Sequence, residues 1–257
     1  MQKAKIGRSF SRAASSYDTL AVFQKQVALR MSHLLPELLP PDFVARRVLD
    51  GGCGTGFGSL CLKRFWPAAE LTGCDVSEAM VDAMRKKGFF ALLGDLEKMP
   101  FPDRRFDFVW SSLALQWCRP NRVFPEMFRV LVPKGQVFFS TLAPGTLTEI
   151  GYAFSGLDDS HRVISFSSVS TLEKALADAG FTGIRLTREK KVMHYPDFRS
   201  ALESIRGIGA GQTDKKRRTL MGKDAWKKAQ ERYESLREEN GLPLTYELIL
   251  GFASAGS

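Results

Sequence analysis

Glycine alternates with other residues in one short segment, Asp-Gly-Gly-Cys-Gly-Thr-Gly-Phe-Gly at 50–58. An apolar run at 47–50 precedes this segment and a helical pattern at 57–65 follows it. Glycine allows sharp backbone turns, and its missing Cβ lets a ligand approach the chain closely. In open α/β sheets, small molecules bind in the loops that follow the strands. We therefore expect a cofactor loop with these members: Asp50, Gly51, Gly52, Gly54 and Gly56.

Two acidic residues follow the next two apolar runs. Asp75 ends the run at 70–75, and Asp95 follows the run at 89–93. Because the carboxyl ends of parallel strands meet at one edge of a sheet, both side chains are expected beside the glycine loop. The Asp75 carboxylate can accept two hydrogen bonds from a ribose diol. Asp95 can accept one from an adenine amino group, with Leu96 covering the ring. This combination predicts a site for an adenosine-containing cofactor.

A dinucleotide cofactor would use the same architecture but a different loop. Its fingerprint is G-x-G-x-x-G/A. Counted from Gly52, the sixth position is Phe57, and counted from Gly54 it is Ser59. Neither is Gly or Ala, so the spacing disfavours a nicotinamide cofactor.

Short apolar runs and helical patterns alternate through the first two thirds of the chain. This alternation predicts a parallel sheet with helices on both faces. The expected strands are 47–50, 70–75, 89–93, 106–111 and 136–142. The expected helices are 57–65, 77–87, 121–131 and 168–179.

The two ends of the chain differ from this core. Apolar residues at three- and four-residue intervals predict one amphipathic helix within 10–35, broken by the Pro-containing segment 35–41. A strand-like run at 183–194 and another at 244–253 enclose a basic, helix-rich stretch. The simplest interpretation is a helical insertion before the last strand.

Charge and composition narrow the class of protein. The net charge of +9 is concentrated between Arg185 and Arg232, with fourteen Lys or Arg against six acidic residues. Such a surface suits an acidic partner. The four cysteines form no C-x-x-C pair and the three histidines are scattered, so no metal site is expected. Without a long apolar run or a secretory signal, we expect no membrane association and a cytoplasmic location.

Across about residues 45–145 this pattern resembles the class I S-adenosylmethionine (SAM) dependent methyltransferases. The resemblance implies an α/β, Rossmann-like fold with a seven-stranded, mostly parallel sheet, helices on both faces and an antiparallel last strand. It implies SAM as the cofactor and S-adenosylhomocysteine as the product, with no metal. It also implies that Asp50 orients the loop, that Asp75 binds the ribose, and that Asp95 and Leu96 contact the adenine.

Four further segments extend the resemblance over nearly the whole chain. They are Phe-Ser-Arg-Ala-Ala-Ser-Ser-Tyr-Asp (10–18), Trp-Ser-Ser-Leu-Ala-Leu-Gln-Trp-Cys (110–118), Ser-Ile-Arg-Gly-Ile-Gly-Ala (204–210) and Pro-Leu-Thr-Tyr-Glu-Leu-Ile-Leu-Gly (243–251). With the glycine loop, they resemble the malonyl-acyl-carrier-protein O-methyltransferase (BioC) family of biotin synthesis. The chain departs from that pattern in two places: Gly51 stands where Ala is common, and Arg206 where some relatives carry Lys. Each change keeps a small or a cationic residue.

That family resemblance implies methyl transfer from SAM to the free carboxylate of a malonyl thioester on acyl carrier protein. A carboxylate is already ionised near neutral pH, so no general base is required. Arg206 is the expected carboxylate-binding cation, since arginine can bind a carboxylate through two hydrogen bonds. Tyr17 is expected to close over the methyl donor or orient the substrate. The expected pocket residues are Ser111, Gln116 and Trp117.

The same interpretation divides the chain into four parts. An N-terminal helical cap covers 1–44, and the SAM-binding core covers 45–195. A basic helical lid covers 196–242 and docks the acidic carrier protein, and the final strand covers 243–257. No nucleic-acid partner is expected.

Three alternatives stay open from the residues alone. The first is a methyltransferase for another small carboxylic acid, trans-aconitate-like, or for a quinone-type precursor. The second is an RNA-binding methyltransferase or module, which the net charge permits. The third is a non-catalytic SAM-binding subunit, which the intact glycine loop disfavours.

Overall fold

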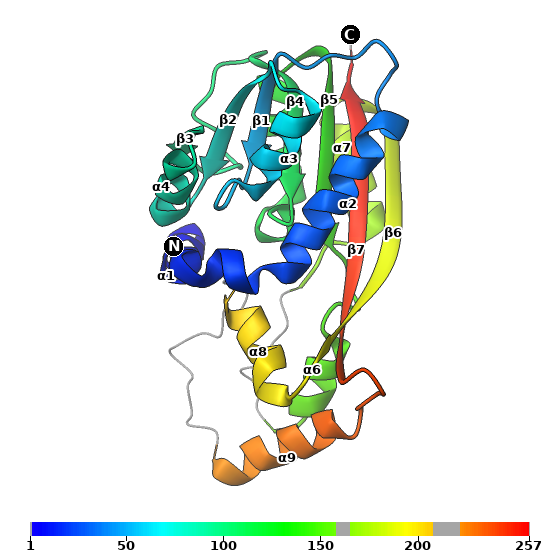
Figure 1. The fold of residues 1–257 in the computed structure, drawn as a ribbon. Helices are drawn as coiled ribbons and strands as arrows, with labels where there is room; N and C mark the ends of the chain where they lie inside the picture. Colours follow the sequence, from blue (N-terminus) through cyan, green and yellow to red (C-terminus); the bar gives the residue numbers. More distant parts are fainter. Residues whose placement is uncertain (1, 158–164, 208–221, 257) are drawn as a thin grey trace.

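A seven-stranded sheet forms the centre of the computed structural model, which describes residues 2–157, 165–207 and 222–256. The strands lie in the order β3-β2-β1-β4-β5-β7-β6 (Figure 1). Their bounds are β1 Arg47–Gly51, β2 Glu70–Asp75, β3 Phe90–Leu93, β4 Phe106–Ser112, β5 Leu131–Leu142, β6 Phe181–Tyr195 and β7 Leu242–Ala255.

All neighbouring strands from β3 to β5 are parallel, whereas β7 runs antiparallel to both β5 and β6. In register, Asp50 lies beside Gly73, and Gly73 lies beside Ala91. The glycine loop, Asp75 and the residues after β3 therefore share the carboxyl edge of the sheet. The predicted Rossmann-like topology, with its antiparallel last strand, is confirmed.

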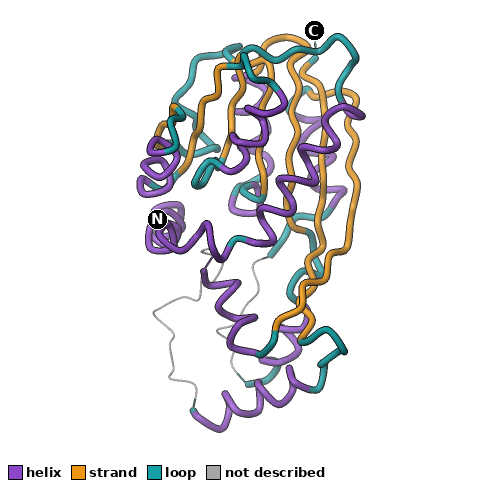
Figure 2. Tube along the Cα trace, viewed as in Figure 1, coloured by secondary structure: helices purple, strands orange, loops and turns teal. Residues whose placement is uncertain are grey.

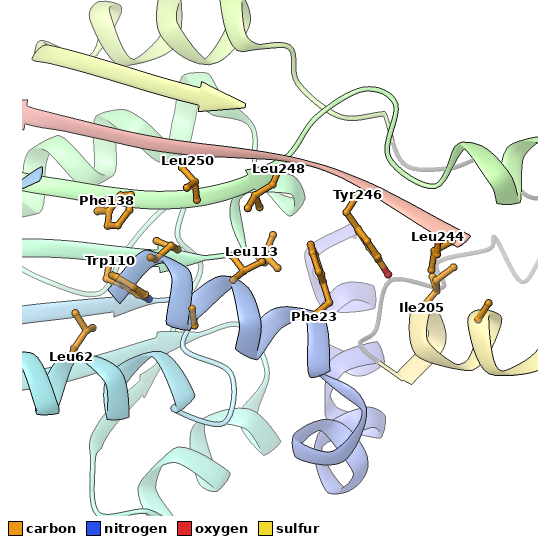
Figure 3. Close-up of a cluster of buried hydrophobic side chains, with 14 of the residues drawn as sticks. Phe23, Leu62, Trp110, Leu113, Phe138, Ile205, Leu244, Tyr246, Leu248 and Leu250 are labelled. Carbon is orange, nitrogen blue, oxygen red and sulfur yellow. The ribbon is translucent and has the colours of Figure 1, made fainter. Parts of the chain in front are cut away.

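Helices cover both faces of the sheet because its strands are apolar on both sides. Val48 and Leu49 illustrate this alternation: Val48 belongs to the buried cluster beneath α2 and α3, and Leu49 to the cluster beneath α5 and α7. Figure 3 shows part of the first cluster, in which Leu62, Trp110 and Phe138 converge. The helices are α2 Val22–Leu38, α3 Phe57–Phe65, α4 Glu78–Lys86, α5 Pro120–Val130 and α7 Val169–Asp178.

The N-terminal region contains two helices where the periodicity predicts one. Helix α1 (Gln2–Leu20) ends before Ala21, whose φ of −79° and ψ of 45° are not helical. Helix α2 then passes through Pro36, so the break expected at 35 is wrong and the helix ends at Leu38. The two helices can therefore take different directions, and Figure 2 shows α1 turned away from α2 toward the carboxyl edge of the sheet.

The predicted helical insertion lies between β6 and β7. Both strands extend beyond the rest of the sheet, and the helices of the insertion pack beside this extension with α6 (Figure 1). The insertion contains α8 Phe198–Gly207 and α9 Lys223–Glu234, and α6 comprises Thr148–Phe154. Helix α6 precedes β6 in the chain and was not predicted. None of the described helices is long and apolar enough to cross a membrane.

Candidate active site

The glycine loop turns directly from β1 into α3. Gly52, Gly54 and Gly56 have φ values of +74°, +51° and +86°, a region that side-chain-bearing residues avoid. Space is also limiting, because a Cβ on Gly52 would lie 2.2 Å from the Cβ of Ala114. The loop thus needs glycine both for its conformation and for its close contact with the segment after β4, and it presents backbone at the start of a helix.

Asp50 lies beneath this loop and is 2% exposed. Its Oδ2 accepts a hydrogen bond of 2.7 Å from the hydroxyl of Ser59, in the first turn of α3. Burial raises the pKa of Asp50 to about 6, although the Ser59 hydrogen bond opposes that shift. A Cβ on Gly58 would lie 3.1 Å from Asp50 Oδ2. Asp50 therefore supports the loop from inside the protein.

Asp75 binds the same loop from the neighbouring strand. Its Oδ2 accepts a hydrogen bond of 3.0 Å from the backbone N–H of Gly54, and its Oδ1 accepts one of 2.8 Å from the N–H of Ser77. Burial raises the pKa of Asp75, while these backbone hydrogen bonds lower it. Each carboxylate oxygen can accept a further hydrogen bond, so Asp75 can bind two more donors such as a vicinal diol.

Asp95 and Leu96 follow β3 at the same edge. Asp95 Oδ1 accepts a hydrogen bond of 3.0 Å from the N–H of Glu97 and lies 3.1 Å from Nζ of Lys3. Leu96 is 6% exposed, and a Cβ added at Gly51 would lie 3.2 Å from one of the Leu96 methyl groups. The acidic and apolar groups predicted to meet an adenine are thus placed together beside the loop.

Helix α1 covers this edge of the sheet. A Cβ on Gly7 would lie 2.8 Å from the carbonyl oxygen of Val76, so helix and loop are in close contact. The hydroxyls of Ser11 and Ser77 share a hydrogen bond of 2.9 Å. No sequence motif signalled that Lys3, Gly7 or Ser11 would contact the loops that follow the strands, because these contacts come from helix packing between distant segments.

Tyr17 lies near the end of α1, against the glycine loop. Its Cε1 is 3.9 Å from the position that a Cβ on Gly54 would take. Burial raises the pKa of Tyr17, and the nearby carboxylates of Asp75 and Asp18 raise it further. The phenol is therefore neutral at neutral pH, and its O–H can donate a hydrogen bond.

The predicted pocket residues lie in and just after β4. Trp117 packs edge-on against Phe10 of α1, with ring centroids 5.8 Å apart. Gln116 donates a hydrogen bond of 2.6 Å to the Leu113 carbonyl, while its buried Oε1 has no hydrogen-bond partner among the described residues. Ser111 is fully buried and donates a hydrogen bond of 2.8 Å to the Gly51 carbonyl. Ser111 therefore supports the cofactor loop, and its role as a pocket residue stays a prediction.

The remaining predicted site residue is Arg206, in the last turn of α8. Its side chain lies outside the described part of the structure. The backbone of α8 is in contact with α1, which brings the insertion to the same edge of the sheet as Tyr17. The basic run Lys215–Arg218 also lies outside the described residues.

These residues fit SAM. The glycine cradle leaves room for close approach of a ligand, and two carboxylates stand at successive strand ends to accept hydrogen bonds from ribose and adenine. The unpartnered Gln116 Oε1 provides a further acceptor after β4. Fold and site together define a SAM-dependent methyltransferase of the Rossmann-like class.

Comparisons with known proteins agree with this class and give the family. A methyltransferase-domain family model matches residues 49–139. The malonyl-[acyl-carrier protein] O-methyltransferase of Herminiimonas arsenicoxydans is 47% identical, over 99% of this chain and 96% of that protein. The chain belongs to that family of methyltransferases. The biotin biosynthesis bifunctional protein BioHC of Teredinibacter turnerae is 33% identical, over 96% of this chain and 46% of that protein.

The fold also matches solved structures. A methyltransferase from Bacillus halodurans C-125, described as putative, superposes with a TM-score of 0.62 at 20% identity, covering 88% of this chain and 99% of that one. At such identity the likeness concerns the fold alone. It confirms the Rossmann-like architecture that the methyltransferase resemblance implied.

Proposed function

We propose that this protein transfers a methyl group from SAM to the free carboxylate of a malonyl thioester on acyl carrier protein, an early step of biotin synthesis. The observation that carries the proposal is the 47% identity to a malonyl-[acyl-carrier protein] O-methyltransferase over 99% of the chain. The aligned region includes the insertion and the last strand, which lie outside residues 49–139 matched by the methyltransferase-domain model. The four unpaired cysteines agree with a reducing compartment, and we place the reaction in the cytoplasm.

The carboxyl edge of the sheet would hold the cofactor. When bound, SAM supplies a methyl group on a positively charged sulfur. Asp75 would accept hydrogen bonds from the ribose hydroxyls while it keeps its contact with Gly54. Asp95 and Leu96 would contact the adenine. The backbone of the glycine loop, oriented by Asp50 from beneath, would lie along the remainder of the ligand. The members of that loop in contact with the ligand would be Gly51, Gly52, Gly54 and Gly56.

Catalysis would rest on position and on exclusion of water. A malonyl carboxylate is ionised at neutral pH and can attack the methyl group without a base. Tyr17 is suited to orienting a substrate and not to removing a proton, because a phenol is neutral at neutral pH and burial raises the pKa of Tyr17 further. Helix α1, which carries Tyr17, would exclude water from the cofactor side.

The acceptor would bind between the segment after β4 and the insertion. Arg206 would bind the malonyl carboxylate and leave one oxygen lone pair free to attack. Trp117 and Gln116 would form the wall of the acceptor pocket on the side of the sheet, with Ser111 behind them. The contact between α1 and α8 supports this arrangement, since it brings the helix of Arg206 to the helix of Tyr17.

The basic insertion would dock the acidic carrier protein. Opposite charges steer association and set the orientation of partners. Reversing the charge at four positions should therefore weaken methylation of malonyl-acyl-carrier protein much more than methylation of a free malonyl thioester. Equal effects on both substrates would refute docking at this surface. The four positions are Lys215, Lys216, Arg217 and Arg218.

The acceptor itself can be tested with a matched pair of substrates. Malonyl- and acetyl-acyl-carrier protein differ by the free carboxylate alone. Mass spectrometry should detect one added methyl group on the malonyl thioester, present as a methyl ester, and none on the acetyl thioester. Equal methylation of both would place the methyl group on the carrier and would refute the proposal.

A further inference from the structure

Asp18, the residue after Tyr17, connects the end of α1 to two other elements. Its Oδ1 accepts a hydrogen bond of 2.5 Å from the hydroxyl of Thr55, and its Oδ2 accepts one of 2.8 Å from Nζ of Lys87. Thr55 lies inside the glycine loop, and Lys87 is the residue that follows α4. One carboxylate thus joins α1, the cofactor loop and α4.

The two contacts of Asp18 differ in their surroundings. Thr55 is 3% exposed, so its hydroxyl is removed from water and its hydrogen bond to a carboxylate is of the strong, charge-assisted kind. The side chains of Lys87 and Asp18 are 31% and 48% exposed, so solvent and salt screen this ion pair. The hydrogen bond to Thr55 is therefore expected to hold α1 against the glycine loop more strongly than the ion pair with Lys87 does.

The contact with Thr55 lies close to the end of α1, because Asp18 is two residues before the last residue of that helix. Helix α1 ends at Leu20, and the non-helical Ala21 separates it from α2. The backbone N–H of Ala21 donates a hydrogen bond of 2.8 Å to the Tyr17 carbonyl, a contact that joins Tyr17 to the end of its own helix and not to the glycine loop. The hydrogen bond to Thr55 anchors the helix one residue from Tyr17, whose ring stands against the neighbouring Gly54.

We propose that Asp18 is a positioning residue for the cofactor site: through Thr55 it holds Tyr17 and the glycine loop together in the arrangement that binds SAM. Asp18 itself need not touch the ligand. The inference rests on the cofactor half of the proposed function and is independent of the methyl acceptor.

Binding of S-adenosylhomocysteine, measured by calorimetry without any acceptor, tests the proposal directly. Asp18→Ala should weaken binding about tenfold, the effect of losing one strong hydrogen bond. The matched control is Asp178→Ala, which removes a carboxylate paired with Lys174 on the exposed surface of α7, 3.0 Å apart, and should leave affinity unchanged. Unchanged affinity in Asp18→Ala would overturn the proposal.

Substitutions of Thr55 separate positioning from a general effect on folding. Thr55→Val removes the donor and should weaken binding about as much as Asp18→Ala, whereas Thr55→Ser keeps the hydroxyl and should restore affinity. The Asp18→Ala/Thr55→Val double variant should be no weaker than either single variant, because both remove one interaction. Effects that multiply in the double variant would overturn the proposal. A Thr55→Ser variant as weak as Thr55→Val would also overturn it, and this result does not depend on whether Asp18→Ala folds.

Steady-state kinetics give a second readout in the intact enzyme. If Asp18 acts on cofactor binding, its replacement raises the KM for SAM about tenfold and changes kcat less than about threefold. A fall in kcat with an unchanged KM for SAM would contradict this role. Failure to methylate a malonyl thioester would refute the proposed acceptor but would leave the calorimetric result intact.

Discussion

Gly52 and Ala114 are in such close contact that a Cβ on Gly52 would lie 2.2 Å from the Cβ of Ala114. Gly52 belongs to the loop after β1, and Ala114 to the segment after β4 that also carries Gln116 and Trp117. The cofactor loop and the candidate acceptor wall therefore form one packed unit. A side chain added at Gly52 would therefore collide with the segment that carries Gln116 and Trp117.

Gly52→Ala should consequently abolish most cofactor binding. The added methyl group overlaps Ala114, and the φ of +74° costs a non-glycine residue about 1–2 kcal/mol. Calorimetry with S-adenosylhomocysteine should show a loss of affinity of at least about tenfold. Gly88→Ala is the matched control, because Gly88 has a φ of +84° with no atom within 4 Å of its added Cβ. If both variants bind equally well, close packing at Gly52 does not matter.

Asp75→Ala, at the end of β2, should weaken cofactor binding more than Glu70→Ala, at the start of the same strand. The substitution removes the acceptor for the Gly54 and Ser77 amides and the proposed ribose contact. Each hydrogen bond to a charged group contributes about 1.5–3 kcal/mol. Glu70→Ala, at the exposed start of β2, removes a carboxylate that pairs with Arg105 at 2.7 Å. Its affinity for S-adenosylhomocysteine should equal that of the wild type. Equal losses in both variants would argue against a cofactor site at the carboxyl edge.

The raised pKa of Asp50 predicts a specific pH dependence of the free energy of unfolding. Its folded-state pKa of about 6 exceeds the value of about 3.9 in an unfolded chain. Between these values the folded protein holds a proton that the unfolded chain has released. The contribution of Asp50 to the free energy of unfolding therefore falls as pH rises from about 4 to 6, by about 3 kcal/mol in all.

Asp50→Asn removes this titration while keeping an oxygen that can accept from Ser59. Urea unfolding at several pH values should show the variant gaining stability relative to the wild type between about pH 4 and pH 6, and a constant difference above that range. A difference that does not change with pH would show that Asp50 is not held with a raised pKa.

Arg206→Ala should leave cofactor binding intact and impair methylation. Loss of a bidentate cation at the carboxylate would lower kcat/KM for the malonyl thioester by about tenfold or more. Arg199→Ala provides a control on the same helix, because Arg199 is 85% exposed and pairs with Glu203. An unchanged kcat/KM in Arg206→Ala would remove this residue from the site.

The parts of the molecule that sequence patterns predict well are those governed by local rules. The glycine loop at 50–58 needs its glycines for positive φ, and the acids Asp75 and Asp95 follow strands whose apolar character is plain in the sequence. The antiparallel last strand came from the family resemblance. The glycine loop and the two strand-end acids, unlike that strand, are each encoded in residues that are neighbours in the chain.

A helical cap at 1–44 over the active site is expected from the family resemblance, but its individual contacts could not be predicted from local rules. Lys3 meets Asp95, and Asp18 meets Thr55, only because α1 turns away from α2 at Ala21. Alanine favours helices, so its type gives no signal of a break. Ala21 is 1% exposed, and tertiary contacts of such buried residues can override local propensity.

The proposed function depends above all on the acceptor being the carboxylate of a malonyl thioester. Initial rates of methyl transfer from SAM, measured in parallel on malonyl-acyl-carrier protein, malonyl-coenzyme A, trans-aconitate and bulk RNA, test it most directly. If a malonyl carboxylate is the acceptor, the malonyl thioesters are methylated, with no transfer to RNA and little to trans-aconitate. Methylation of RNA or trans-aconitate without methylation of either malonyl thioester would contradict it.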